Sequence, residues 1–279
     1  MPCTYVIVDV FTNVALQGNP LAVFLDASGL SSQQMQSIAR EMNLSETTFV
    51  LPARNGGDAH VRIFTPVNEL AFAGHPMLGT AVALGESTTR KQLLLETAMG
   101  TIPLTFQRTQ GRPLTASMRQ PIPSWEPYNA TDELLAALGV ASSILPVDAY
   151  RNGPRHIFIG LKDTAALSRV RPDLNALAQH KDMAANCFAG SGEQWRMRMF
   201  SPAYGVAEDA ATGSAAGPLA VHLSRYGLIR FGQQIEITQG VEMGRPAHMY
   251  ASSNGSCQQV DAVDVAGSAV VIARGTLLI

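Results

Sequence analysis

Two short segments of the chain combine a glycine with residues that can bind anions or move protons. Gly74 is followed by His75, and Gly213 is followed by Ser214, with Asp209 shortly before it. Amides at a helix start are unpaired and carry partial positive charge, and glycine lets a ligand approach the backbone closely. If both segments open helices, they predict a binding site for a carboxylate. The alternative is two ordinary tight turns.

Glu46 is the candidate for proton transfer. It stands between a predicted helix and an apolar strand, in the stretch Leu44-Ser45-Glu46-Thr47. A carboxyl group buried at such a junction would have a raised pKa and could shuttle a proton near neutral pH. A solvated loop carboxylate is the alternative.

His75 and Asp209 have two interpretations each. His75 is either a proton donor or orienting group, or a histidine of the core or of a helix cap. In the pair Glu208-Asp209, one carboxylate either caps the next helix or receives a substrate proton. Ser214, His75 and Asp209 could suggest a hydrolytic triad, but no Gly-x-Ser-x-Gly sequence surrounds Ser214, so we do not expect one.

Helices and strands must position these residues. Ser31 and Gln34 form a capping-box pattern at the start of a helix that ends near Asn43, and the β-branched and aromatic run Thr47–Leu51 predicts a strand. Pro76 fits the first turn of a helix, and a further helix is expected from Gly213 to about Tyr226. The prolines at 121, 123 and 127 mark the best candidate for a linker.

The two glycine segments belong to an internal repeat. Val61-Arg62-Ile63-Phe64-Thr65-Pro66 precedes the first, and Met197-Arg198-Met199-Phe200-Ser201-Pro202 precedes the second. Each copy has the pattern of a strand, a loop, a small-residue turn and a helix. The repeat predicts a two-lobed molecule with a pseudo-dyad, and the junction of two lobes is a preferred place for a ligand pocket.

Composition sets the outer limits. The chain has 279 residues, 46% of them hydrophobic and 15% charged, which suits one large or two medium domains with a real core. A net charge of −2 gives no reason to expect nucleic acid or an anionic membrane as partner. Three scattered cysteines and a start without a signal-peptide pattern suggest the cytoplasm. The cysteines and histidines include no pair at the spacing of metal ligands, so we expect no metal. The sequence has no phosphate-binding loop, so we expect no nucleotide cofactor.

Six short motifs follow one another through nearly the whole chain. They are Asp9-Val10-Phe11, Gly18-Asn19-Pro20-Leu21-Ala22-Val23, Met42-Asn43-Leu44-Ser45-Glu46-Thr47, Arg62-Ile63-Phe64-Thr65-Pro66, Phe72-Ala73-Gly74-His75-Pro76 and Glu208-Asp209-Ala210-Ala211-Thr212-Gly213-Ser214-Ala215. Each motif alone is weak, but the six in this order are specific, and together they resemble the PhzF family of phenazine-biosynthesis isomerases.

The resemblance implies an α+β fold like that of diaminopimelate epimerase, with two pseudo-symmetric lobes that each wrap a β-sheet around a central helix. We expect an N-terminal lobe over residues 1–120 and a C-terminal lobe over 128–279, with the last strand able to cross back. The epimerase uses one cysteine per lobe as acid and base. The matching positions here resemble Ala73 and Thr212, so racemisation by two thiols is not expected.

The implied activity is the isomerisation of trans-2,3-dihydro-3-hydroxyanthranilate without a cofactor. In the family's pattern Glu46 removes the proton at ring carbon 3 and returns it at carbon 1. His75 and Asp209 bind and polarise the hydroxyl and amine, and Ser45 contacts the ligand. The amides of Gly74, Gly213 and Ser214, with the Ser214 hydroxyl, hold the carboxylate.

The resemblance also implies a homodimer that binds a small amino-acid-like molecule. Two alternatives stay open. One is a related isomerase or epimerase that acts on another amino-acid-like substrate, since a fold does not determine a substrate. The other is a non-catalytic protein that binds small carboxylates.

Overall fold

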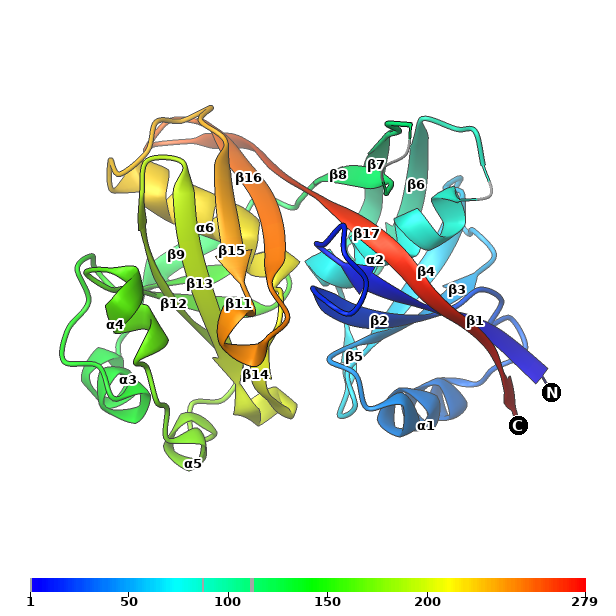
Figure 1. Cartoon of the computed structure of the whole chain (residues 1–279), viewed down its shortest axis with the longest axis horizontal. Coiled ribbons are helices and arrows are strands. Elements are labelled where there is room, and N and C mark those ends of the chain that lie inside the picture. The colour runs from blue at the N-terminus through cyan, green and yellow to red at the C-terminus, as the bar shows by residue number, and fades with distance from the viewer. Residues whose placement is uncertain (1, 87, 111–112) are drawn as a thin grey trace. The chain divides into compact units, whose positions relative to one another are not determined.

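The computed structural model describes residues 2–86, 88–110 and 113–279 (Figure 1). The chain forms two compact units. The first unit contains the residues up to Arg119 together with Ala266–Ile279, and the second contains Gln120–Val265. The long strand β17, Val260–Leu278, therefore begins in the second unit and continues through the first.

The first unit wraps its strands around one helix. Its elements are β1 (Pro2–Val10), β2 (Asn19–Phe24), α1 (Ser32–Met42), β3 (Thr47–Leu51), β4 (Ala59–Phe64), β5 (Glu69–Leu70), α2 (Gly74–Gly85), β6 (Gln92–Thr97), β7 (Gly100–Gln107) and β8 (Thr115–Arg119). Pairing runs β17-β1-β2-β3-β4-β6-β7-β8 and returns to β17. This closed ring leaves α2 buried over almost its whole length.

The second unit repeats this plan. Its elements are β9 (Ser124–Pro127), α3 (Thr131–Leu138), β10 (Asp148–Arg151), β11 (Arg155–Gly160), α4 (Thr164–Ser168), α5 (Leu174–Leu177), β12 (Ala184–Ser191), β13 (Gln194–Ser201), a 3₁₀ turn η1 (Pro202–Tyr204), β14 (Val206–Asp209), α6 (Gly213–Arg225), β15 (Ile235–Gln239), a 3₁₀ turn η2 (Val241–Met243) and β16 (Ala247–Gly255). Strands β11, β12, β13, β15 and β16 pair in the same parallel and antiparallel order as β2, β3, β4, β6 and β7. Helix α6 is buried like α2.

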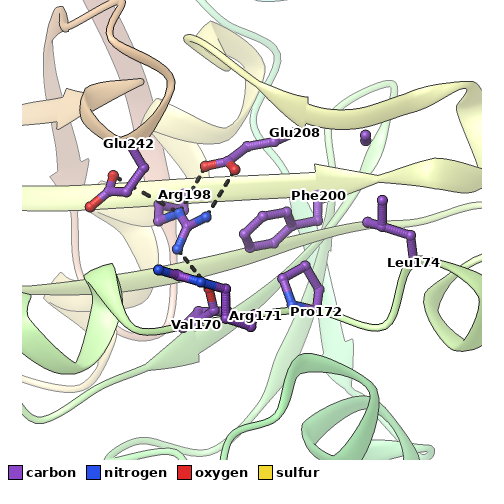
Figure 2. A pocket seen from close by; sticks show the side chains of 9 residues that line it. Val170, Arg171, Pro172, Leu174, Arg198, Phe200, Glu208 and Glu242 are labelled. Carbon is purple, nitrogen blue, oxygen red and sulfur yellow. Dashed lines mark hydrogen bonds and ion pairs between the residues drawn. The ribbon is translucent and has the colours of Figure 1, made fainter.

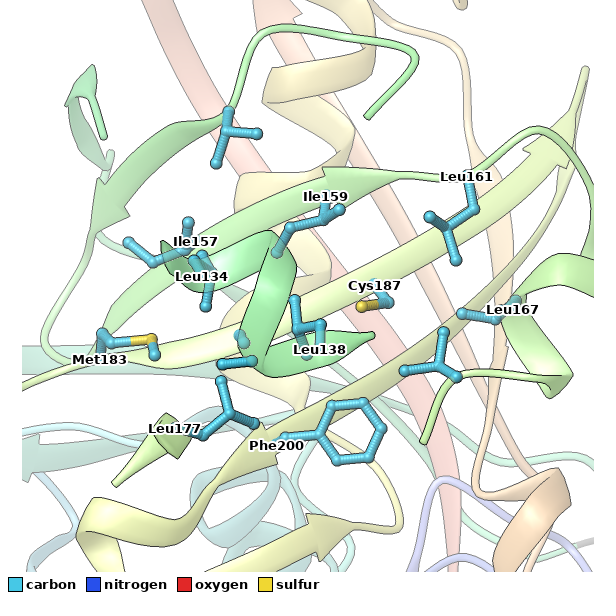
Figure 3. Close-up of a cluster of buried hydrophobic side chains, with 14 of the residues drawn as sticks. Leu134, Leu138, Ile157, Ile159, Leu161, Leu167, Leu177, Met183, Cys187 and Phe200 are labelled. Atoms are coloured by element: carbon cyan, nitrogen blue, oxygen red, sulfur yellow. The ribbon is translucent and has the colours of Figure 1, made fainter. Parts of the chain in front are cut away.

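Each unit has its own hydrophobic core outside the central helix. In the first unit, Phe49 stacks on Phe24 and meets Phe64 edge-on beneath α1. In the second unit, Leu134 and Leu138 of α3 pack with Leu167 and Leu177 of the short helices onto the sheet (Figure 3). Apolar burial of this kind contributes about 25 cal/mol per Å² and holds each sheet around its helix.

Local sequence signals account for the helix ends. The capping box at Ser31 and Gln34 is confirmed, since each residue's side chain accepts a hydrogen bond from the other's backbone amide. The helix ends at Asn43, which has the left-handed conformation (φ 50°) that asparagine tolerates. Pro76 lies in the first turn of α2, as its missing donor allows.

One expectation from the sequence is wrong, and one strand was not predicted. The proline-rich stretch 121–127 contains β9, which pairs with β10, and it belongs to the second unit. A proline is compatible with a strand end, where its missing donor is not needed, and Pro127 ends β9. Strand β12 was not expected at all, because alanine, asparagine and glycine are poor strand formers. Its place between β11 and β13 buries Ala184–Ala189 and overrides that preference.

Within the described residues, every helix is too short or too polar to span a membrane.

Candidate active site

The first unit brings Glu46 and His75 together. Glu46 lies in the short connection between α1 and β3, and its side chain is only 16% exposed. Its Oε2 atom lies 3.2 Å from Nδ1 of His75, the second residue of α2. The alternative interpretation of Glu46, a carboxylate exposed to solvent in a loop, is therefore wrong. Ser45 directly precedes Glu46, and Gly74 directly precedes His75.

His75 is neutral at physiological pH. Burial lowers its pKa from 6.5 to about 3, and a hydrogen bond to the Pro20 carbonyl opposes this shift only in part. Its contact with Glu46 is therefore the close approach of a neutral ring to a carboxyl group and not an ion pair. A neutral imidazole places no positive charge beside Glu46, so it does not fix that group as a carboxylate.

The start of α2 leaves its first amides available. The cap residue Ala73 has an extended backbone and a methyl side chain, which cannot accept a hydrogen bond from the helix. Ser, Thr, Asp or Asn would normally satisfy an amide at this position. The buried amides at Gly74 and His75 therefore belong to an uncapped helix start, which is the arrangement that favours an anion.

In the second unit, Asp209 is held by Thr212 and Gln239. The Thr212 hydroxyl donates to Asp209 Oδ2 at 2.8 Å. The Gln239 amide donates to the Asp209 carbonyl and to the Thr212 hydroxyl oxygen, both at 2.9 Å, and its oxygen accepts from the Thr212 amide at 3.0 Å. Because the Gln239 amide donates a hydrogen bond to the Thr212 hydroxyl oxygen, the hydroxyl's own hydrogen points to Asp209.

Glu208 has a different role from Asp209. Its carboxylate receives two hydrogen bonds from the guanidinium of Arg198, at 2.8 and 2.9 Å, beside a pocket of about 440 Å³ (Figure 2). The Arg198 guanidinium also lies over the ring of Phe200. The repeat in the first unit has the same arrangement: the Arg62 guanidinium lies over Phe64 and donates two hydrogen bonds to the Glu69 carboxylate. The arginines of the repeat thus brace the hairpins that precede both glycine turns. The cap residue of α6 is Thr212, so neither Glu208 nor Asp209 caps that helix.

Buried amide side chains hold the first turn of α6. Gln120 donates to the Gly213 carbonyl at 2.8 Å, and Asn152 donates to the Ser214 carbonyl at 2.9 Å. The second bond has a clear cause, because Pro218 lacks the amide proton that would bond the carbonyl four residues earlier. Gly217 lets Gln120 come close, since a Cβ there would lie 2.4 Å from the Gln120 oxygen.

The structure thus places the predicted residues in two groups. Ser45, Glu46, Gly74 and His75 lie together in the first unit, and Asp209, Gly213 and Ser214 lie together in the second. The supporting residues missed by the sequence analysis are Gln120, Asn152 and Gln239. None belongs to a short motif, because each contributes one side chain from a distant strand or loop; only the Asn152-Gly153-Pro154 turn carried a local signal.

The chain matches the family model described as "Phenazine biosynthesis-like protein" over residues 8–275. A trans-2,3-dihydro-3-hydroxyanthranilate isomerase from Pseudomonas chlororaphis is 60% identical over 275 residues, which cover 99% of each chain. The chain therefore belongs to the phenazine biosynthesis-like family, also called PhzF, and the resemblance seen in its motifs is confirmed.

Solved structures confirm the fold. A PhzF-family phenazine biosynthesis protein from Bacillus anthracis has a TM-score of 0.86 at 25% identity, with complete coverage of both chains. A hydroxyproline epimerase from Agrobacterium vitis has a TM-score of 0.66 at 12% identity, over 99% of this chain and 91% of that one. The expected α+β fold of the epimerase type, with a sheet around a central helix, is correct.

Proposed function

We propose that the chain is an isomerase that converts trans-2,3-dihydro-3-hydroxyanthranilate to its ketone tautomer in phenazine biosynthesis. The observation that carries this proposal is the contact between the Glu46 carboxyl and the buried neutral imidazole of His75 at the start of α2, at 3.2 Å. The identity of 60% to an isomerase of this name supports the choice of substrate.

Glu46 is the acid and base of the proposed reaction. As a carboxylate it removes the proton from ring carbon 3, and as an acid it returns a proton to carbon 1 on the same face. The resulting enol tautomerises to the ketone. The proton leaves and returns through one side chain, so the reaction is balanced without an oxidant, a reductant or a cofactor. A positioned acid or base of this kind contributes about 10²- to 10⁴-fold in rate.

The neutral state of His75 fits this role. A charged imidazolium beside Glu46 would stabilise the carboxylate and make its protonated form scarce. A neutral ring adds no such charge, so both forms of Glu46 are accessible during the two proton transfers.

The other site residues bind the substrate in this proposal. Asp209 and His75 engage the amine and hydroxyl groups. The amides of Gly74, Gly213 and Ser214, with the Ser214 hydroxyl, hold the carboxylate, and Ser45 contacts the ligand beside Glu46. We also propose that the chain works as a cytoplasmic homodimer, and that its folding domains follow the two compact units, 1–119 with 266–279 and 120–265.

The test compares Glu46→Gln with Glu41→Gln, a matched change at an exposed residue of α1. We expect Glu46→Gln to bind a substrate-like aminobenzoate as well as the wild type does, measured by calorimetry. It should lose at least about 10²-fold in turnover, because it removes the acid and base. Glu41→Gln should keep full turnover.

Full activity of Glu46→Gln would refute the acid/base role. Turnover in deuterated water adds a second criterion. Deuterium at carbon 1 indicates exchange through Glu46, whereas retained substrate hydrogen indicates a transfer shielded from solvent. A wild type that binds the aminobenzoate but leaves the dihydro substrate unchanged would favour a related amino-acid-like substrate instead.

A further inference from the structure

Ser214 has a buried partner that the proposed mechanism does not use. Nε2 of His156, on β11, lies 3.1 Å from the Ser214 hydroxyl oxygen. On the other side of the ring, Nδ2 of Asn186, on β12, lies 3.4 Å from Nδ1 of His156. All three side chains are buried within the second unit.

The orientation of Asn186 determines the direction of the hydrogen bonds. Its Nδ2 atom also lies 2.9 Å from the Ala184 carbonyl, which only accepts hydrogen bonds. A flipped amide would place two acceptor oxygens in contact there. Nδ2 is therefore the group that faces His156. Its second hydrogen lies between Nδ1 of the ring and the Ile157 carbonyl, each 3.4 Å away, and because an amide nitrogen does not accept, Nδ1 is an acceptor.

His156 carries its proton on Nε2 as a result. The ring is neutral, because burial and the charge of Arg151 lower its pKa to about 3. A neutral imidazole whose Nδ1 accepts must bear hydrogen on Nε2, so His156 donates to the Ser214 oxygen. The Ser214 hydroxyl then has its own proton left to donate elsewhere.

We propose that His156, oriented by Asn186, is a positioning residue that makes the Ser214 hydroxyl a hydrogen-bond donor to the carboxylate of the bound substrate. This inference rests on the proposed function for the identity of the ligand. It also excludes Ser214 as a nucleophile activated by His156, because a ring nitrogen that already carries a proton cannot remove the hydroxyl proton.

Direct observation of the ring is the first test. We expect ¹⁵N spectra of the histidine-labelled protein, assigned with His156→Gln, to show the neutral tautomer protonated at Nε2 from pH 6 to 8. The tautomer protonated at Nδ1, or a charged ring, would overturn the proposal.

A double-mutant cycle tests the functional consequence. Losing a hydrogen bond to a charged group corresponds to about a 10- to 100-fold change in affinity, so Ser214→Ala should weaken binding of 3-hydroxyanthranilate by about that factor. His156→Leu should weaken it similarly, and the double variant no further. Neither change should alter binding of 2-aminophenol, which lacks the carboxylate. His156→Gln, which keeps a donor, should restore most of the affinity.

His222→Leu is the matched control. His222 is equally buried, has a pKa near 3 and lies on α6, but it contacts Tyr150 and not Ser214. It should lose similar stability and keep carboxylate binding. Independent, additive effects of the two site changes, or wild-type affinity in folded His156→Leu, would refute the inference. Because binding is measured apart from turnover, a protein inactive on the dihydro substrate would refute only the proposed function.

Discussion

The Ser214 carbonyl depends on Asn152 because Pro218 stands four residues later, and this dependence can be measured. Asn152 is 2% exposed and donates to that carbonyl at 2.9 Å. Asn152→Leu keeps a similar shape but leaves a buried carbonyl without its donor. An unsatisfied buried polar group costs about 1–3 kcal/mol, so the free energy of unfolding should fall by that amount.

Restoring a helix donor should recover part of this loss. In Asn152→Leu/Pro218→Ala the new amide at 218 can donate to the Ser214 carbonyl in the normal helical pattern. A net intramolecular hydrogen bond is worth about 0.5–1.5 kcal/mol, so Pro218→Ala should be more stabilising by that amount in the Asn152→Leu protein than in the wild type.

Urea unfolding of the wild type, both single variants and the double variant measures this coupling. Each kcal/mol should also move the melting temperature by about 2–4 °C in a chain of this size. If Pro218→Ala has the same effect in both proteins to within about 0.5 kcal/mol, the two residues act independently and the reasoning is refuted.

Three further predictions concern the site and its surroundings. Burial lowers the pKa of three histidines from 6.5 to about 3; they are His75, His156 and His222. Below about pH 6.5 these histidines take up protons in the unfolded chain but not in the folded chain. The free energy of unfolding should therefore fall as pH falls from 6.5 towards 3, by up to about 1.4 kcal/mol per pH unit for each histidine. A free energy of unfolding in urea that stays constant from pH 7 to 5 would contradict this. Thr212→Val removes the hydroxyl that donates to Asp209 and should lower kcat/KM about tenfold or more with the chain still folded, whereas an unchanged value would show that Asp209 needs no such support. Burial raises the pKa of the Cys187 thiol to about 12, so a thiol reagent should modify the exposed Cys257 quickly and Cys187 only on unfolding, without loss of activity; rapid labelling of Cys187 in the native protein would be the contrary result.

Local signals in the sequence were sufficient for the elements that carry the site. The capping box at Ser31, the left-handed Asn43 and the glycine turns at Gly74 and Gly213 act over a few residues, so their geometry follows from nearby residue types alone. Strand β12 could not be found this way, because its formation depends on burial between two strands and not on the preference of its own residues.

The repeat and the motifs likewise determined the family, the fold and the candidate residues, because they preserve the order and chemical type of side chains along the chain. Only the tertiary structure decided the states of those residues. The nearness of Glu46 and His75, the neutral charge of the buried histidines and the direction of the proton on Thr212 all depend on groups from distant strands. Burial and hydrogen-bond geometry arise when the sheets close around α2 and α6, so no short stretch of sequence contains them.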